Sequence, residues 1–113
     1  MTQMMTTPTN PAGNAYQKDF LVAVRDGNKD ELERILETKD GKINVNLYDT
    51  EGQTALHLSC LDGNFELVKL LVKFGADVKL ANRDGWNALH IAAYSGHQDI
   101  ALYLISANRN SKR

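Results

Sequence analysis

Residues 51–57 read Glu-Gly-Gln-Thr-Ala-Leu-His, and residues 84–90 repeat this pattern as Asp-Gly-Trp-Asn-Ala-Leu-His. The two stretches are 33 positions apart, and Gly63 and Gly96 have the same separation. A fixed period of this length indicates a stack of similar supersecondary units, because each unit alone cannot bury its apolar face. The repeat therefore predicts a stacked array of similar units.

A period of 33 residues, with a Leu-His pair shortly after a glycine turn, is typical of ankyrin repeats. We predict an all-α fold, an ankyrin repeat solenoid of three repeats with short β-hairpin-like loops. Such arrays use their exposed faces to bind other proteins. The sequence therefore directs attention to a protein partner rather than to a substrate.

The repeat domain is expected at residues 15–107, with repeats at about 16–46, 47–79 and 80–107. The first repeat is irregular, because Gly27 precedes Gly63 by 36 positions instead of 33. Residues 1–14 show no apolar periodicity, so we expect a disordered tail there. We assign residues 108–113 to a C-terminal tail.

Composition excludes several classes of protein. Of 113 residues, 42% are hydrophobic, the formal net charge is −1, and there is a single cysteine. A single cysteine rules out an internal disulfide framework. A net charge near zero gives no overall attraction to nucleic acid or to an anionic membrane. No apolar run approaches the ~20 residues that span a bilayer. We expect no direct nucleic-acid or membrane partner, and a location in the nucleus, the cytoplasm or both.

The residue types that could carry chemistry recur with the repeat itself. His57 and His90 are 33 positions apart, and we predict that they hydrogen-bond loop backbone. Cys60 aligns with Ala93, so we predict a buried, inert thiol. The sequence has no phosphate-binding loop and no zinc-ligand spacing. We therefore expect no enzyme activity, no cofactor and no metal.

The two ends of the predicted stack differ in polarity. Glu31 and Arg34 of repeat one align with apolar residues of the later repeats, namely Leu67, Leu70, Ile100 and Tyr103. Polar residues at these positions are expected of an N-terminal capping repeat. At the other end, Lys69 of repeat two is replaced by Leu102 in repeat three. Leu102 is either one tolerated surface leucine or part of a docking surface.

Trp86 follows the turn glycine of the last loop, where repeat two has Gln53. It either packs against a neighbouring loop or forms part of an interface, in which tryptophan is enriched. We predict that the protein-interaction residues are Arg83, Asp84, Trp86, Asn87, Ala93, Tyr94 and Leu102.

Three stretches are more particular than the general repeat pattern: Leu-Ala-Asn-Arg-Asp-Gly-Trp at 80–86, Gly-His-Gln-Asp-Ile at 96–100 and Leu-Tyr-Leu-Ile at 102–105. With them the chain resembles the family of Notch-regulated ankyrin repeat proteins, closely over about residues 44–105 and more loosely over 16–43.

This resemblance implies a nuclear feedback inhibitor of Notch signalling. Members of the family bind the Notch intracellular domain, which carries ankyrin repeats of its own, and its DNA-binding transcription factor CSL. The family is also linked to Wnt signalling through a lymphoid enhancer-binding factor. The alternative is an unrelated small ankyrin adaptor, such as a kinase-inhibitor-like protein.

Overall fold

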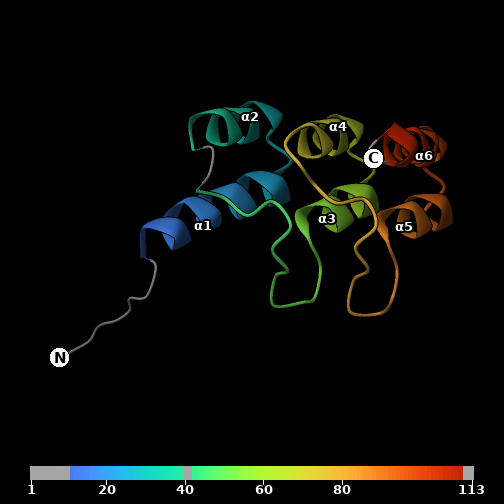
Figure 1. The fold of residues 1–113 in the computed structure, drawn as a ribbon, viewed down its shortest axis with the longest axis horizontal. Helices are drawn as coiled ribbons and strands as arrows, with labels where there is room; N and C mark the ends of the chain where they lie inside the picture. Colours follow the sequence, from blue (N-terminus) through green and yellow to red (C-terminus); the bar gives the residue numbers. More distant parts are fainter. Residues whose placement is uncertain (1–10, 40–41, 111–113) are drawn as a thin grey trace. The chain divides into compact units, whose positions relative to one another are not determined.

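The computed structural model describes residues 11–39 and 42–110 of the chain. Within them are six α-helices and no β-strand beyond an isolated antiparallel bridge between Ala81 and Asn87. The helices are arranged as three consecutive hairpins, as expected of three ankyrin repeats (Figure 1). The predicted all-α fold is confirmed. No helix among the described residues is long and apolar enough to cross a membrane.

The first compact unit ends at Asn44 and contains α1 (Pro11–Asp26) and α2 (Lys29–Thr38). Gly27, at φ 68°, ends α1 in the left-handed region, and the side chain of Asn28 caps α2 by accepting a hydrogen bond from the Glu31 backbone. The two helices bury an apolar core between them, made of Phe20, Ala23, Val24, Leu32, Ile35 and Leu36.

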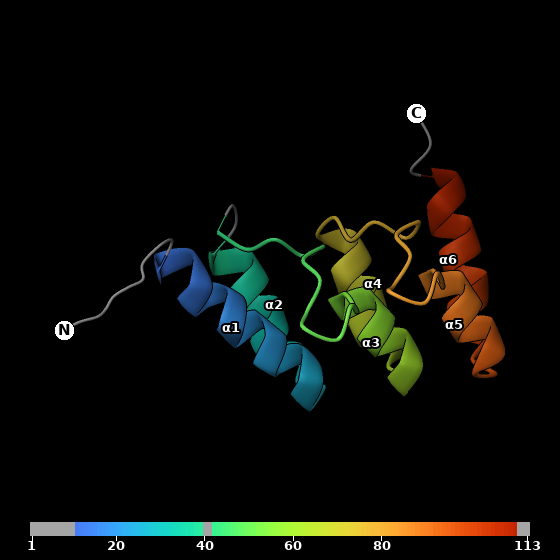
Figure 2. The same cartoon turned by 90° about the horizontal axis from the view of Figure 1, so that it is seen from below.

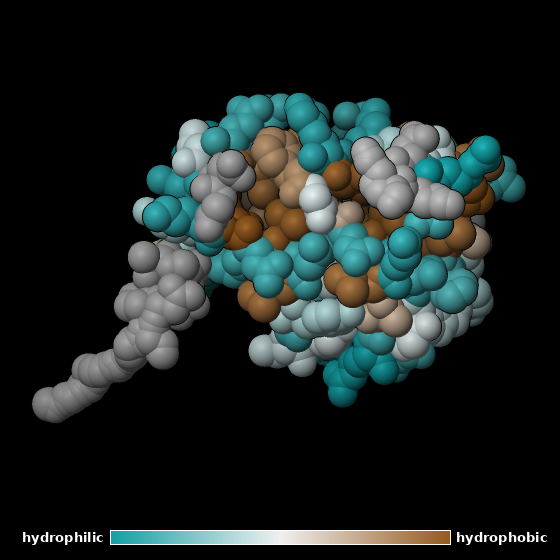
Figure 3. Space-filling view, in the orientation of Figure 1, coloured by the Kyte–Doolittle hydropathy of each residue, from teal (hydrophilic) through white to brown (hydrophobic). Residues whose placement is uncertain are grey.

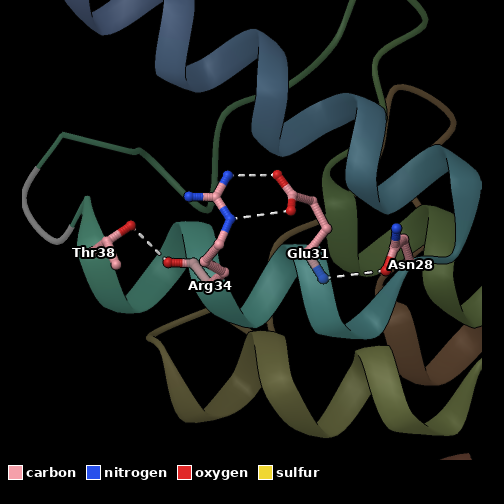
Figure 4. A network of polar contacts seen from close by, with 4 residues as sticks. All are labelled: Asn28, Glu31, Arg34 and Thr38. Carbon is pink, nitrogen blue, oxygen red and sulfur yellow. Dashed lines mark hydrogen bonds and ion pairs between the residues drawn. The ribbon is translucent and has the colours of Figure 1, made fainter.

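One face of α2 is polar, as the sequence predicts for a cap. The Arg34 guanidinium donates two hydrogen bonds to the Glu31 carboxylate, at 3.1 and 2.6 Å (Figure 4). These bonds lower the pKa of Glu31. Both side chains are largely exposed, so the pair makes this face of the helix polar and contributes little to the free energy of unfolding.

The second compact unit, residues 45–113, holds the two regular repeats. Helices α3 (Ala55–Asp62) and α4 (Phe65–Lys73) form one hairpin, and α5 (Ala88–Tyr94) and α6 (Gln98–Asn110) form the other. Helix α3 packs beside α5, and α4 packs beside α6 (Figures 1 and 2). The unit therefore has two helical layers, and we call α3 and α5 the inner helices and α4 and α6 the outer helices. Its core contains Leu56, Cys60, Leu67, Val68, Leu71, Ala88, Ile91, Ala92, Ile100 and Leu104.

The hairpin-like loops that precede α3 and α5 are closed by backbone hydrogen bonds. In the first loop the Asp49 amide donates to the Gln53 carbonyl at 2.8 Å, and in the second the Asn82 amide donates to the Trp86 carbonyl at 2.8 Å. We call these loops the first finger (residues 47–54) and the second finger (residues 80–87). The Arg83 amide also donates to the Gly52 carbonyl at 3.0 Å, which joins the two fingers.

Two helix boundaries differ from the expected tails. Helix α1 begins at Pro11, so residues 11–14 are helical rather than part of a tail, and residues 1–10 lie outside the described residues. Proline suits the first turn of a helix, because the amide it lacks has no partner there. Helix α6 continues to Asn110, through residues 108–110 of the expected C-terminal tail.

Candidate protein-interaction site

One asparagine side chain cross-links the second finger and joins it to the first. The Oδ1 atom of Asn82 accepts hydrogen bonds from the amides of Asp84 and Trp86, at 2.9 and 3.0 Å. Its Nδ2 atom donates to Oε1 of Gln53 in the first finger at 3.1 Å. Trp86 is therefore presented by a turn in which the backbone amides of residues 83–86 all donate hydrogen bonds.

The indole of Trp86 rests on α5 rather than on a neighbouring finger. It meets the Tyr94 ring edge-to-face, with centroids 5.2 Å apart and planes at 84°, and the His90 ring at 6.1 Å and 79°. Such edge-to-face pairs are favourable for aromatic quadrupoles. Trp86 keeps 37% of its surface exposed and Tyr94 keeps 81%, so the pair forms an aromatic projection rather than a core.

Two hollows flank Trp86. The larger lies at the end of repeat three, encloses about 310 Å³, and is lined by Asp84, Gly85, Trp86, His90 and Ala93. We call it the terminal hollow. The other encloses about 270 Å³ and is lined by Gln53, Leu61, Asn82, Asp84, Trp86, Ile91, Tyr94 and Ser95. We call it the finger groove, because it lies between the fingers and the inner helices α3 and α5.

The end of repeat three is open where the end of repeat two is covered. Cys60 is fully buried, whereas its equivalent Ala93 is exposed, because no further repeat follows α5 and α6 within the described residues. Leu102 is 68% exposed on α6, and Ile105 is exposed on the same helix. In Figure 3, hydrophobic residues reach the surface at the α5–α6 end. An unfinished apolar face of this kind indicates an interaction surface.

The predicted interaction residues do not form one continuous set. Asp84, Trp86 and Tyr94 line the finger groove, and Ala93 lines the terminal hollow, which Asp84 and Trp86 share. Leu102 belongs to neither hollow and lies apart on α6.

Two of the predicted residues have structural contacts. The Asn87 side chain caps α5 by accepting from the His90 amide at 2.9 Å. The Arg83 guanidinium donates to the Glu51 carbonyl at 3.4 Å. The prediction missed Leu61, which is exposed in the finger groove and lies 33 positions before Tyr94. The repeat period was the signal that could have found it.

The histidines and the cysteine have the structural roles that the sequence predicts. Nδ1 of His57 accepts from the Thr54 amide at 3.0 Å, so Nε2 carries the proton and donates to the Leu80 carbonyl at 3.0 Å. Burial lowers the pKa of His57, which keeps the ring neutral in this arrangement. Burial also raises the pKa of the Cys60 thiol to about 12. Among the described residues, no group of three or more His, Cys, Asp or Glu side chains could hold a metal ion.

Comparison with known proteins identifies the array. A family model described as ankyrin repeats (3 copies) matches residues 20–113. The chain is 62% identical over 96 residues to the Notch-regulated ankyrin repeat-containing protein of Xenopus tropicalis, with 84% of each chain covered. It is 64% identical over 91 residues to the human protein of that name, with 80% of each chain covered. The chain belongs to the family of Notch-regulated ankyrin repeat-containing proteins.

Membership of this Notch-regulated family confirms the resemblance inferred from the residues at 80–105. A more distant relative is protein phosphatase 1 regulatory subunit 27 of Homo sapiens, 44% identical over 87 residues. That match covers 77% of this chain and 55% of the phosphatase subunit. By name, the phosphatase relative is a regulatory subunit, and the other relatives are ankyrin repeat proteins regulated by Notch.

Proposed function

We propose that this chain is a non-enzymatic feedback inhibitor of Notch signalling that acts in the nucleus. It binds the ankyrin repeats of the Notch intracellular domain together with the transcription factor CSL, and so lowers transcription. Family membership supports the pathway. The observation that carries the binding mode is the open end of repeat three, with Trp86, Ala93 and Leu102 exposed.

The geometry of repeat two explains why another repeat array is a suitable partner. Within this chain, the end of repeat two is completed by repeat three: Cys60 becomes buried, and His57 donates a hydrogen bond to Leu80 of the following finger. The equivalent residues of repeat three, Ala93 and His90, are exposed. An ankyrin array stacked on this end would cover both positions, because each repeat buries its neighbour's face.

The proposal is tested first at Trp86. Trp86→Glu places a charge in the terminal hollow and should weaken binding to the preassembled complex of intracellular domain, CSL and DNA by about 2 kcal/mol or more, which is about 30-fold. Isothermal titration calorimetry measures the affinity, and thermal melting checks that the variant folds.

Thr50→Glu is the control, because Thr50 is exposed in the first finger and lines neither hollow. It introduces the same charge but should leave the affinity within about twofold. Equal affinities for the wild type and Trp86→Glu would remove Trp86 from the interface and contradict the proposed docking at repeat three.

Binding to separate components tests whether the site is composite. We expect weak or no binding to the intracellular domain alone or to CSL alone, and firm binding to the assembled complex. Tight binding to one isolated component would show that the other is not needed. A link to Wnt signalling, through a lymphoid enhancer-binding factor, is a further part of the proposal and is tested by the same titration with that factor.

A second candidate function is that of an ankyrin adaptor outside the Notch pathway. The similarity to a protein phosphatase 1 regulatory subunit favours a phosphatase over a kinase as its partner. The match is less extensive than those to the Notch-regulated relatives and covers only 55% of that subunit. Affinity capture with the wild type and Trp86→Glu, probed for CSL and for the phosphatase catalytic subunit, separates the two functions.

A further inference from the structure

The finger groove has a chemistry distinct from that of the terminal hollow. Its apolar lining comes from Leu61, Ile91 and the aromatic pair Trp86 and Tyr94, and its polar lining comes from Gln53, Asn82, Asp84 and Ser95. None of these eight residues is a cation. The groove therefore combines aromatic rings with a carboxylate and no positive charge of its own.

The aromatic pair is arranged to receive a cation. Because the planes of Trp86 and Tyr94 meet at 84°, the two rings form a corner instead of a closed stack. Tyr94 is 81% exposed, so most of its ring surface is open to a ligand. The negative face of an aromatic ring attracts guanidinium and ammonium groups, and tryptophan does so most strongly.

The carboxylate of Asp84 supplies the complementary charge. Its backbone amide is bound to Asn82, but its side chain forms no ion pair within the described part of the chain. The nearest cation in the sequence, Arg83, is engaged with the first finger, since its guanidinium donates to the Glu51 carbonyl. The Asp84 carboxylate is therefore available to pair with a positive group from outside.

The acceptors of the fingers limit what else can bind. Oδ1 of Asn82 already accepts two backbone hydrogen bonds, and Oε1 of Gln53 accepts one from Asn82. The groove consequently offers one free carboxylate and two ring surfaces to a ligand. A planar guanidinium satisfies both, because it stacks on aromatic faces and binds a carboxylate through two parallel N–H groups.

We propose that the finger groove binds an arginine side chain from an extended segment of a partner protein, with its guanidinium between Asp84 and the Trp86–Tyr94 pair. This goes beyond the proposed docking of an ankyrin array on the terminal hollow and does not depend on which protein supplies the arginine. Leu61 and Ile91 contact the aliphatic part of that side chain.

The single tryptophan of the chain gives a direct measurement. The peptide acetyl-Gly-Arg-Gly-amide is titrated to 50 mM, while the indole N–H signal of Trp86 and the ring signals of Tyr94 are followed by NMR. We expect a saturable shift at both residues. The citrulline peptide has nearly the same shape without the charge and should bind at least about tenfold more weakly.

Two variants locate the charge. Asp84→Asn should weaken the arginine peptide about tenfold, because it removes the charge-assisted hydrogen bonds. Asp62→Asn, at the exposed end of α3 and outside the groove lining, removes the same charge and should leave binding unchanged. Tyr94→Leu keeps an apolar side chain without the ring face and should weaken binding at least threefold. Thermal melting confirms that each variant is folded.

Three results would overturn the inference: no saturable shift at Trp86 and Tyr94, equal binding of the arginine and citrulline peptides, or equal effects of Asp84→Asn and Asp62→Asn. None of them bears on the Notch complex, because no component of it is present in these titrations. Conversely, failure of the calorimetric test with the assembled complex would leave the arginine groove standing.

Discussion

Replacing one buried serine should stabilise the protein. Ser59 on α3 is 1% exposed, and within the described residues its Oγ atom has no hydrogen-bond partner. A buried hydroxyl without a partner costs about 1–3 kcal/mol. Ser59→Ala removes the hydroxyl and keeps the rest of the side chain, and the equivalent residue of repeat three is already alanine, Ala92, which is itself fully buried.

The magnitude has two parts. Alanine is a better helix former than serine by about 0.5 kcal/mol, and relief of the desolvation penalty adds about 1 kcal/mol or more. We expect a total of about 1.5–2 kcal/mol in the free energy of unfolding, which for a domain of this size is a rise of about 4–10 °C in Tm. Urea unfolding followed by circular dichroism measures the change.

Two further variants isolate the buried hydroxyl. Ser106→Ala, on the exposed side of α6, should give only the propensity part of the gain. Ala92→Ser adds a hydroxyl at the equivalent buried site and should destabilise the protein by about 1–3 kcal/mol. If Ser59→Ala gains no more than Ser106→Ala, or loses stability, then the hydroxyl has a partner such as a carbonyl of the preceding helical turn, and the reasoning is refuted.

Three other expectations follow from single residues. The pKa of His57 is lower in the folded state, so below pH about 6.5 the unfolded chain binds more protons than the folded one. The stability contributed by His57 should therefore be complete above pH about 6.5 and should fall as the pH drops below it. His57→Gln should flatten this pH dependence, which urea titrations at pH 8 and 5.5 measure. The Cys60 thiol, with a pKa of about 12, should resist iodoacetamide at pH 8 and react only in denaturant, whereas rapid labelling of the native protein would argue against its burial. Gly63→Ala should lower Tm more than Gly96→Ala: both glycines have positive φ, but only at Gly63 would the new Cβ lie 2.5 Å from the His97 ring. Equal losses would show that backbone strain alone is responsible.

The regular repeats could be predicted from the sequence because their signals are local and periodic. Thr54 and His57 recur as Asn87 and His90, and each pair forms a capping box at the start of its helix. The structural role of His57 followed from its place in the repeat, and its hydrogen bond to Leu80 confirms that role.

The helix ends were predicted less well, because they depend on single residues at the repeat boundary. Gly75, at φ 104°, allows the chain to leave α4 after Lys73, and the sequence shows that Asn108 stands at the equivalent place in repeat three. Without a glycine to adopt the left-handed conformation, α6 continues to Asn110. The replacement is visible in the sequence, although the predicted C-terminal tail begins at residue 108.

The site was harder to predict because exposure depends on the place of a repeat in the array. Cys60 and Ala93 hold the same repeat position, yet one is fully buried and the other is exposed. Asn87 shows the opposite difficulty: a polar residue beside Trp86 suggests a contact with a partner, but its side chain is used to cap α5. Sequence comparison between repeats identifies equivalent residues, but it does not show which of them is covered by an adjacent repeat and which is exposed.

The two proposals place two different ligands at one tryptophan. Trp86 lies where the second finger meets the end of the array, so one part of its indole lines the terminal hollow and another lines the finger groove. The terminal hollow is open because no described repeat follows it, and it suits an apolar repeat face. The finger groove lies between two fingers and carries an unpaired carboxylate, so it suits a cationic side chain. A partner that stacks on the end and places an arginine in the groove would engage both sites. Once one contact has formed, the other would form within the complex at a high effective concentration, so the combined affinity would exceed that of either contact alone.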